Sequence, residues 1–263
     1  MFNVKRFSSL LNTQWLGRQL WFFNEIASTN AYLQTKKNRY TAHGLTCIAD
    51  NQRQGRGLYG KNWVAEPGRN LTFTTVFKPQ SNDCLQTLSL MCAFSVCDVF
   101  YQHTGLDFTL KWPNDVYYKN QKVGGLLTET SFTGTKLDRI LLGIGLNINQ
   151  IEFPEELKEK ACSLSQMNNK QEFPREVILA QILDRIEQNY KDWENRDDLL
   201  IKSINRKIIG YGDWVKLQVD GQVLDDSYKL LGINSRGLMH VLNQNDDVKV
   251  FTHEEVRIHP NSP

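Results

Sequence analysis

The sequence lacks the features that would place it in a membrane or in an oxidising compartment. No apolar run approaches the roughly 20 residues that a helix needs to cross a bilayer, and no secretory signal pattern is present. There is no Cys-x-x-Cys pair, and the cysteines are odd in number: Cys47, Cys84, Cys92, Cys97 and Cys162. These absences argue against a disulfide framework or a zinc site and predict reduced, mostly buried thiols in a cytoplasmic protein.

The net charge is small, and the common nucleotide-binding motifs are absent. The formal net charge is +2, so the bulk charge does not indicate a nucleic-acid or membrane partner. No G-x-x-x-x-G-K-S/T sequence occurs, which excludes a P-loop. Gly55, Gly57 and Gly60 formally fit G-x-G-x-x-G, but a turn and the extended run Leu71–Phe77 follow where a Rossmann fingerprint requires a helix. We therefore do not expect a Rossmann site.

Helical periodicity occurs at four places in a chain of 263 residues that is 40% hydrophobic and 23% charged, as expected for a soluble globular protein. Ser28 or Thr29 can cap a helix that runs to about Lys37, and apolar residues recur at helical spacing over 85–99. Pro174 opens a third helix. An apolar stripe near the N-terminus predicts one more, formed by Leu10, Leu11, Trp15, Leu16, Leu20 and Trp21.

Extended segments alternate with these helices. Strands are expected at 44–49, 71–77, 106–111, 122–131 and 137–148. Together with the helices they predict an α+β fold with a mixed sheet flanked by helices. The polar stretch 151–170 has no strong period and predicts a mobile loop. From Ile208 onwards, short strand-like pieces separated by turn residues predict a small barrel or sandwich. We therefore expect two domains, at 1–207 (core 25–195) and 208–263.

One segment has the composition of an anion-binding loop. Residues 54–63 combine three glycines with Arg56, Lys61 and Trp63. Glycines let the backbone approach a ligand closely and present its N–H groups to anions. The two cations add positive charge, and the tryptophan offers a flat face. Such a loop suits a phosphate or carboxylate beside a planar ring, although most G-x-G runs are merely turns.

Four segments, in order along the chain, resemble the biotin–protein ligase family in a short form without the N-terminal DNA-binding domain. They are Glu25–Asn30, Gln52 with the glycine loop, Lys111–Asp115 with Lys122–Leu127, and Gly143–Asn149. The resemblance is strong from residue 28 to about 164. It is looser through the C-terminal tail, which is similar to the SH3-like barrel of these ligases. The catalytic domain is therefore expected to have the biotin/lipoate ligase fold.

The resemblance implies a two-step reaction. ATP, with Mg²⁺, and biotin would form biotinyl-5′-AMP and pyrophosphate. A lysine of a biotin carboxyl carrier domain, of the kind found in acetyl-CoA carboxylase, would then displace AMP to form an amide. Neither nucleic acid nor a membrane is an expected partner, and a homodimer is left open.

The resemblance and the chemistry of the side chains together indicate where the substrates would bind. Two anions must meet, so we expect Arg56 and Lys122 to be the catalytic cations. Asp115 is the expected Mg²⁺ ligand. The biotin site would comprise Ser28, Thr29, Asn30, Gln52, Arg56, Gly57, Leu58, Lys122, Gly124 and Gly125. The ATP site would comprise Arg56, Lys61, Trp63, Lys111, Asn114, Asp115, Asn147 and Asn149.

Most of these residues also have a purely structural interpretation. Ser28 could simply cap a helix, Trp63 could be a core aromatic residue, and 113–115 has the composition of a turn. Lys122 by itself could be a solvated lysine at a strand edge. Leu58 departs from the family, in which many relatives have an arginine. Its backbone N–H remains, but its side chain puts retention of the reactive adenylate in doubt.

Three competing functions are left open. A lipoate ligase or octanoyl transferase shares the fold class, but it would carry a different glycine-rich motif with a histidine, or an acyl-accepting cysteine, and neither is visible. A biotin-sensing regulator is the second alternative. A DNA-binding form of it would need a helix-turn-helix, for which the 24 residues before Glu25 are too few. A non-catalytic biotin-binding scaffold would be expected to have lost Arg56 or Lys122.

Overall fold

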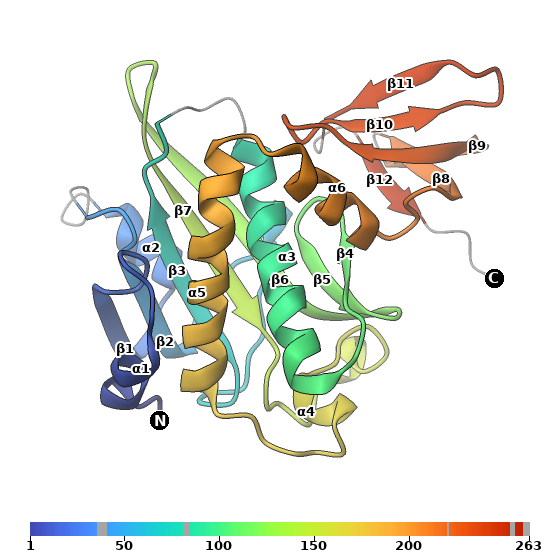
Figure 1. Cartoon of the computed structure of the whole chain (residues 1–263). Coiled ribbons are helices and arrows are strands. Elements are labelled where there is room, and N and C mark those ends of the chain that lie inside the picture. Colours follow the sequence, from blue (N-terminus) through green and yellow to red (C-terminus); the bar gives the residue numbers. More distant parts are fainter. Residues whose placement is uncertain (36–40, 81–84, 220, 253–255, 260–263) are drawn as a thin grey trace.

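Two β-sheets and the helices around them form the structure (Figure 1), a computed structural model that describes residues 1–35, 41–80, 85–219, 221–252 and 256–259. The larger sheet has seven strands in the order β1-β2-β3-β7-β6-β5-β4. β1 is parallel to β2, and the other neighbouring pairs are antiparallel. The expected mixed sheet is therefore confirmed. Its strands are β1 (Leu20–Ile26), β2 (Thr46–Gln52), β3 (Leu71–Phe77), β4 (Thr109–Lys111), β5 (Asp115–Tyr118), β6 (Gln121–Thr133) and β7 (Lys136–Leu146).

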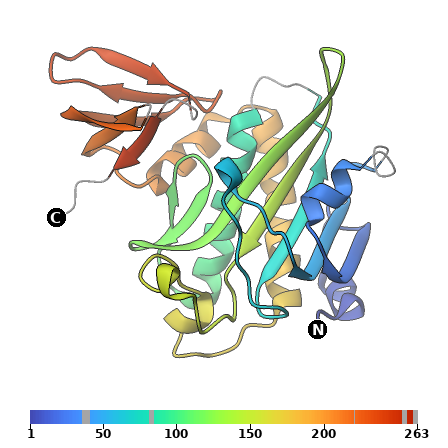
Figure 2. The same cartoon turned by 180° about the vertical axis from the view of Figure 1, so that it is seen from behind.

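Helices cover both faces of this sheet. The two long helices α3 and α5 lie side by side on one face, and the short helix α2 lies on the other (Figures 1 and 2). α3 is buried on most of its surface because it packs between the sheet, α5 and α6. The helices are α1 (Val4–Leu10), α2 (Thr29–Gln34), α3 (Leu85–Thr104), α4 (Leu164–Met167), α5 (Arg175–Glu194) and α6 (Asp198–Lys207).

The chain before β1 differs from the prediction of one helical stripe. α1 ends at Leu10, and the last two residues of the stripe belong to strand β1. Between these elements, the backbone N–H groups of Gln14, Trp15 and Leu16 all donate to the Glu187 carboxylate of α5, at 2.5, 3.0 and 2.8 Å. A carboxylate that lies 171 to 173 residues later in the chain thus takes the donors that a continuing helix would use. The predicted helix through these residues is therefore wrong, although Leu11 and Leu16 do pack in the core as expected of the stripe.

The C-terminal sheet is the small β-rich unit expected after residue 208. Its five strands are antiparallel in the order β11-β10-β9-β8-β12. They are β8 (Trp214–Val219), β9 (Gln222–Ile233), β10 (Met239–Leu242), β11 (Val248–Phe251) and β12 (Val256–His259). Asn205 of α6 exchanges two hydrogen bonds with the backbone of Ile233, at 3.0 and 2.8 Å. α6 therefore joins the two sheets, and the division at 207 stays a prediction.

Other elements depart from the predicted bounds or were not predicted. Helix α2 ends at Gln34, and Lys37 lies outside the described residues. Strand β5 and helix α6 were not expected. The stretch 151–170 contains a 3₁₀ turn (Glu155–Leu157) and α4, whose first turn is fixed by a capping box between Ser163 and Gln166. Local hydrogen bonds therefore order part of a stretch that composition predicts to be a loop.

The predicted burial of thiols is confirmed where it can be assessed. Cys47, Cys92, Cys97 and Cys162 are free and buried, and Cys84 lies outside the described residues. Across the part of the chain that the structure describes, no helix has both the length and the apolar character needed to cross a membrane.

Candidate active site

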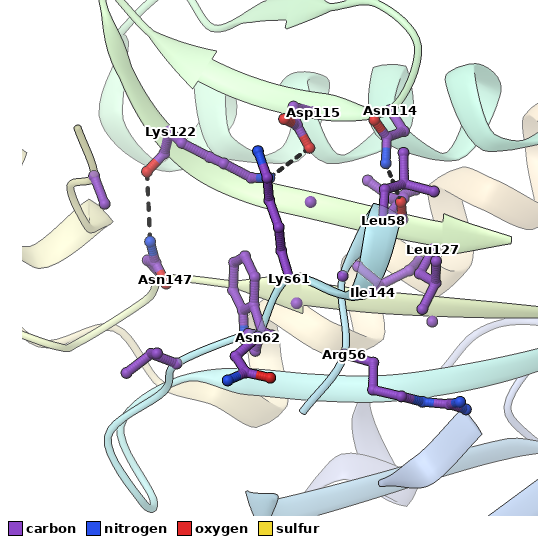
Figure 3. Close-up of a pocket in the computed structure, with 18 of the residues that line it drawn as sticks. Arg56, Leu58, Lys61, Asn62, Asn114, Asp115, Lys122, Leu127, Ile144 and Asn147 are labelled. Carbon is purple, nitrogen blue, oxygen red and sulfur yellow. Dashed lines mark hydrogen bonds and ion pairs between the residues drawn. The ribbon is translucent and has the colours of Figure 1, made fainter. Parts of the chain in front are cut away.

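Segments far apart in the sequence meet around a single cavity of about 460 Å³ (Figure 3). The start of α2, the end of β2, the glycine loop, β6, β7 and the segment 153–161 all contribute to its wall. It therefore brings together residues from all four sequence segments that resemble the ligases. The predicted residues that line it are Ser28, Thr29, Asn30, Gln52, Arg56, Gly57, Leu58, Lys61, Trp63, Lys111, Asn114, Asp115, Lys122, Gly125 and Asn147.

Missing side chains on β6 and β7 form the hollow of the cavity. A Cβ added at Gly145 would lie 2.4 Å from the Trp63 ring, and one at Gly143 would lie 2.5 Å from Asn30 Oδ1. Gly125 pairs with Gly145 across the two strands, and a Cβ there would lie 2.9 Å from Lys122 Nζ. All three positions therefore leave room for polar or aromatic groups to lie close to the sheet.

The glycine loop folds back on itself above this floor. The N–H of Gly57 donates to the carbonyl of Lys61 at 2.7 Å, and the N–H of Trp63 donates to the carbonyl of Gly55 at 3.0 Å. Gly60 has a φ of +71°, which a glycine adopts without strain at this turn. The Trp63 ring lies inside, where its Nε1 is buried and has no hydrogen-bond partner in the described part of the chain.

Two cations of the cavity rest on two different carboxylates. Lys122 Nζ lies 2.6 Å from Asp115 Oδ1, and Arg56 Nη2 lies 3.3 Å from Glu129 Oε2. Figure 3 shows Lys61 directed toward the Lys122–Asp115 pair, whereas Arg56 points away from it. The two predicted catalytic cations therefore line one cavity, but their charged ends point in different directions.

The turn at 111–115 both shapes the cavity and contributes to its wall. The peptide bond between Trp112 and Pro113 is cis. Asn114 makes two hydrogen bonds that hold the turn in place. Its side-chain amide donates to the carbonyl of Leu126 on β6, and its backbone carbonyl accepts the Leu126 N–H at 2.9 Å. These two hydrogen bonds fix the turn against β6. Asp115, the first residue of β5, then faces Lys122. Residues 113–115 therefore form a turn and also line the cavity.

The two asparagines after β7 have different environments. Asn147 lines the cavity, and its Nδ2 donates to the carbonyls of Lys122 and Cys162 at 3.4 and 3.2 Å. Its Oδ1 is buried without a partner among the described residues. Asn149 instead pairs with the backbone of Phe173 through both ends of its amide, at 2.9 and 2.8 Å, and does not line the cavity.

Short polar side chains close the end of the cavity at α2. Ser28 does cap α2, since its hydroxyl accepts the N–H of Ala31 at 3.4 Å, and it also lines the cavity. Gln52 Oε1 accepts the N–H and the hydroxyl of Thr29, at 2.7 and 3.0 Å. Asn30 donates to Glu129 at 2.7 Å. Gly124 does not line the cavity, because alternation along β6 places it against Leu146.

Burial keeps the nearby weak acids protonated. Burial, and after it the Asp115 charge, raise the pKa of Tyr117 to about 12. Burial also raises the pKa of the Cys162 thiol to about 12. A thiol with such a pKa is not a nucleophile at neutral pH, because the thiolate is the reactive form. Cys162, which follows a residue of the cavity wall, therefore does not fit the acyl-accepting cysteine of an octanoyl transferase.

Some residues in or beside the cavity wall were not identified from the sequence. Glu129, which lies beside the wall and contacts Arg56, could have been found, because it follows Gly125 and Leu127 at the two-residue period of one strand face. Arg257 comes from β12 of the other sheet, and nothing local in the sequence signals its place. The remaining unpredicted wall residues include Asn62, Phe73, Tyr117, Leu127, Ile144, Phe153 and Lys160.

Comparison with known proteins gives a consistent result. A model of the Biotin/lipoate A/B protein ligase family matches residues 22–147. The bifunctional ligase/repressor BirA of Bacillus subtilis is 26% identical over 253 residues, which are 94% of this chain and 76% of that protein. The biotin–[acetyl-CoA-carboxylase] ligase of Mycobacterium tuberculosis is 27% identical over 210 residues, which are 78% of this chain and 76% of the relative.

A solved structure resembles this one over almost its whole length. It is the biotin protein ligase from Aquifex aeolicus in complex with biotin and ATP, which is 30% identical. The match covers 93% of this chain and 100% of that chain, with a TM-score of 0.80. The likeness therefore includes the C-terminal sheet as well as the large one.

Proposed function

Because the chain belongs to the biotin protein ligase family, we propose that the cavity of Figure 3 is where it activates biotin with ATP and passes it to a carrier domain. In the first step the biotin carboxylate attacks the α-phosphorus of ATP and pyrophosphate leaves. In the second step a lysine amine attacks the carbonyl carbon of the mixed anhydride and AMP leaves. The observation that carries the proposal is that one cavity joins a short-polar end, several cations and a half-buried tryptophan.

The short-polar end suits the ureido ring of biotin. That ring has one acceptor oxygen and two N–H donors, and Ser28, Thr29 and Gln52 offer hydroxyl and amide groups at this end. Thr29 already occupies Gln52 Oε1, which leaves the Gln52 amide nitrogen as a donor for the ligand. A buried site of this kind discriminates against analogues that lack the matching polar group.

The cations suit the place where carboxylate and phosphate meet. Lys122 lines the same cavity, where a compact ammonium can face the biotin carboxylate. Arg56 can bind two anions through its fork once it leaves Glu129. Lys61 and Lys111 line the same space and can face the remaining phosphates. Positive groups at this point lower the barrier, because negative charge gathers there in the transition state.

Trp63 and Asn147 suit the adenine. The tryptophan ring offers a stacking surface, and the unpartnered Oδ1 of Asn147 can accept a hydrogen bond from the exocyclic amino group. A buried acceptor without a partner costs free energy, so a ligand donor there contributes to binding. Asn149 is engaged with Phe173 and would support the segment around it instead of touching ATP.

Asp115 fits the Mg²⁺ that would accompany ATP. It is the one carboxylate in the cavity wall among the described residues, and no group of three or more potential metal-binding side chains occurs there. Mg²⁺ is commonly held by one or two carboxylates together with substrate phosphates, so a single aspartate is a sufficient protein ligand. The ion would supply charge neutralisation at the phosphates.

The proposed acceptor is a lysine of a biotin carboxyl carrier domain. Incubating the protein with ATP, a purified acceptor domain and either biotin or lipoate tests the assignment directly. We expect the acceptor mass to rise by one biotinyl group only with biotin and ATP together. Modification by lipoate instead would support the rival ligase, and no modification by either acid would oppose a catalytic role.

A further inference from the structure

We propose that Glu129 is a positioning residue that holds Arg56 away from ATP before the first step; the inference rests on the proposed function. A single oxygen, Glu129 Oε2, takes both the Nδ2 of Asn30 at 2.7 Å and the Nη2 of Arg56 at 3.3 Å. Glu129 lies on β6 at the same face as Gly125 and Leu127, just beyond the end of the cavity floor.

The carboxylate side of this pair is fixed. Asn30 is buried, with 3% of its surface exposed, and its Oδ1 lies within hydrogen-bond reach of the Thr74 hydroxyl on β3. The same hydroxyl lies 2.7 Å from the hydroxyl of Thr29. Thr74 and Asn30 thus brace Glu129 from the interior of the sheet face, so the carboxylate cannot follow Arg56 without breaking bonds in a buried network.

The arginine side of the pair is free to move. Arg56 has 42% of its side chain exposed, against 21% for Glu129. It belongs to a loop that is closed mainly by bonds within itself. Its contact with Glu129 is the longer of the two that the carboxylate makes. The pair therefore opens by rotation of the arginine alone.

The direction in which Arg56 points determines whether the Glu129 carboxylate weakens or strengthens ATP binding. Figure 3 shows its guanidinium pointing away from Lys122 and Lys61, toward which the triphosphate would lie. Arg56 must leave Glu129 before it can serve the reacting phosphate. Glu129 thus competes with ATP for the same cation, and removing its charge should favour ATP binding.

The test substitutes the carboxylate by its neutral isostere. Glu129→Gln keeps an oxygen for Asn30 and removes the ion pair. In biotin-dependent exchange of pyrophosphate into ATP, we expect the KM for ATP to fall about two- to five-fold with kcat unchanged. This change in KM corresponds to about 0.4–1 kcal/mol, which lies within the range of about 0.2–1 kcal/mol measured for exposed ion pairs. In an Arg56→Ala background the same substitution should leave the KM for ATP unchanged.

A matched control lies at the base of the same loop. Glu25 likewise accepts an asparagine amide, from Asn51 at 2.9 Å, and pairs with an arginine, Arg53, at 3.5 Å. Neither Glu25 nor Arg53 lines the cavity, whereas Arg56, the partner of Glu129, does. Glu25→Gln should therefore leave the KM for ATP unchanged.

The outcomes separate the inference from the function on which it rests. An unchanged or raised KM for ATP in Glu129→Gln, or an equal fall in the Arg56→Ala background, overturns the inference. If Glu129→Gln does not fold, Glu129→Asp, whose shorter side chain withdraws from Arg56, is judged by the same criterion. Absence of biotin-dependent exchange in the unaltered protein would instead overturn the proposed function.

Discussion

Asn147 Oδ1 and Trp63 Nε1 are buried at the same cavity, and within the described part of the chain neither has a hydrogen-bond partner. One is an acceptor and the other a donor. The Asn147 amide is held in one orientation, because its nitrogen donates to the carbonyls of Lys122 and Cys162. The cavity therefore presents an acceptor where we propose that the adenine binds, and the backbone carbonyls around Asn147 fix the direction of its amide.

A fixed acceptor at Asn147 predicts selectivity for ATP over GTP. Guanine carries an oxygen where adenine carries an amino group, so two acceptors would face each other in a buried place. We expect GTP to support biotin-dependent pyrophosphate exchange at least about 100-fold less well than ATP. Asn147→Ala should reduce this discrimination to about ten-fold or less. Comparable exchange with the two nucleotides in the unaltered protein would show that Asn147 does not read the base.

Loss of either principal cation should slow adenylate formation. Arg56→Ala and Lys122→Ala should each reduce the rate by about 10²–10³-fold, the effect of removing one electrostatic stabiliser. Both side chains are partly exposed, so the variants should remain folded. The measurement is biotin-dependent pyrophosphate exchange, with Lys136→Ala, at the exposed start of β7, as the control. Near-normal exchange in both variants would contradict the assignment.

The segment 151–164 should become more protected when the adenylate forms. It carries Phe153, Leu157 and Lys160 of the cavity wall. Its backbone is bonded to the backbone of β6 only in its last part, through Lys122 N–H to Lys160 O at 2.8 Å and Cys162 N–H to Lys122 O at 3.0 Å. We expect hydrogen exchange to slow at 151–159 on addition of biotin and ATP, because closure excludes water from a labile anhydride. Equal exchange with and without the substrates would argue against such a closure.

Leu58 should make the adenylate easier to lose. It lines the cavity but offers only apolar contact and its backbone N–H. A hydrogen bond to a charged group contributes about 1.5–3 kcal/mol, so an arginine there would slow escape by roughly 10- to 150-fold. The test compares adenylate dissociation from the unaltered protein and from Leu58→Arg. If the arginine variant releases adenylate as fast, other parts of the loop or the segment 151–164 retain it.

The residues whose place in the cavity wall can be predicted from the sequence lie on regular strands or tight loops. Lys122 and Gly125 of β6 and the glycines of the loop occupy positions set by local chemistry and by the two-residue period. Asn149 does not fit this logic, because β7 ends at Leu146 and the strand period no longer fixes where later side chains point. Its partner, Phe173, lies 24 residues onward.

The errors in the predicted fold have non-local causes. The apolar residues near the N-terminus have helical spacing. However, three backbone N–H groups of this segment donate to the Glu187 carboxylate, which belongs to a helix late in the chain. Arg257 reaches the cavity from a separate sheet, so its position depends on how the two sheets pack. Neither effect can be read from a window of local sequence.

The close contact between Gly145 and Trp63 means that a substitution at one position limits which residues fit at the other. Because a Cβ at 145 would lie 2.4 Å from the indole, an alanine there is compatible only with a smaller ring at 63, and the two changes should not be additive. A smaller ring would widen the space beside the base. The pair therefore offers a route to a variant that accepts an enlarged nucleotide analogue which the unaltered cavity excludes.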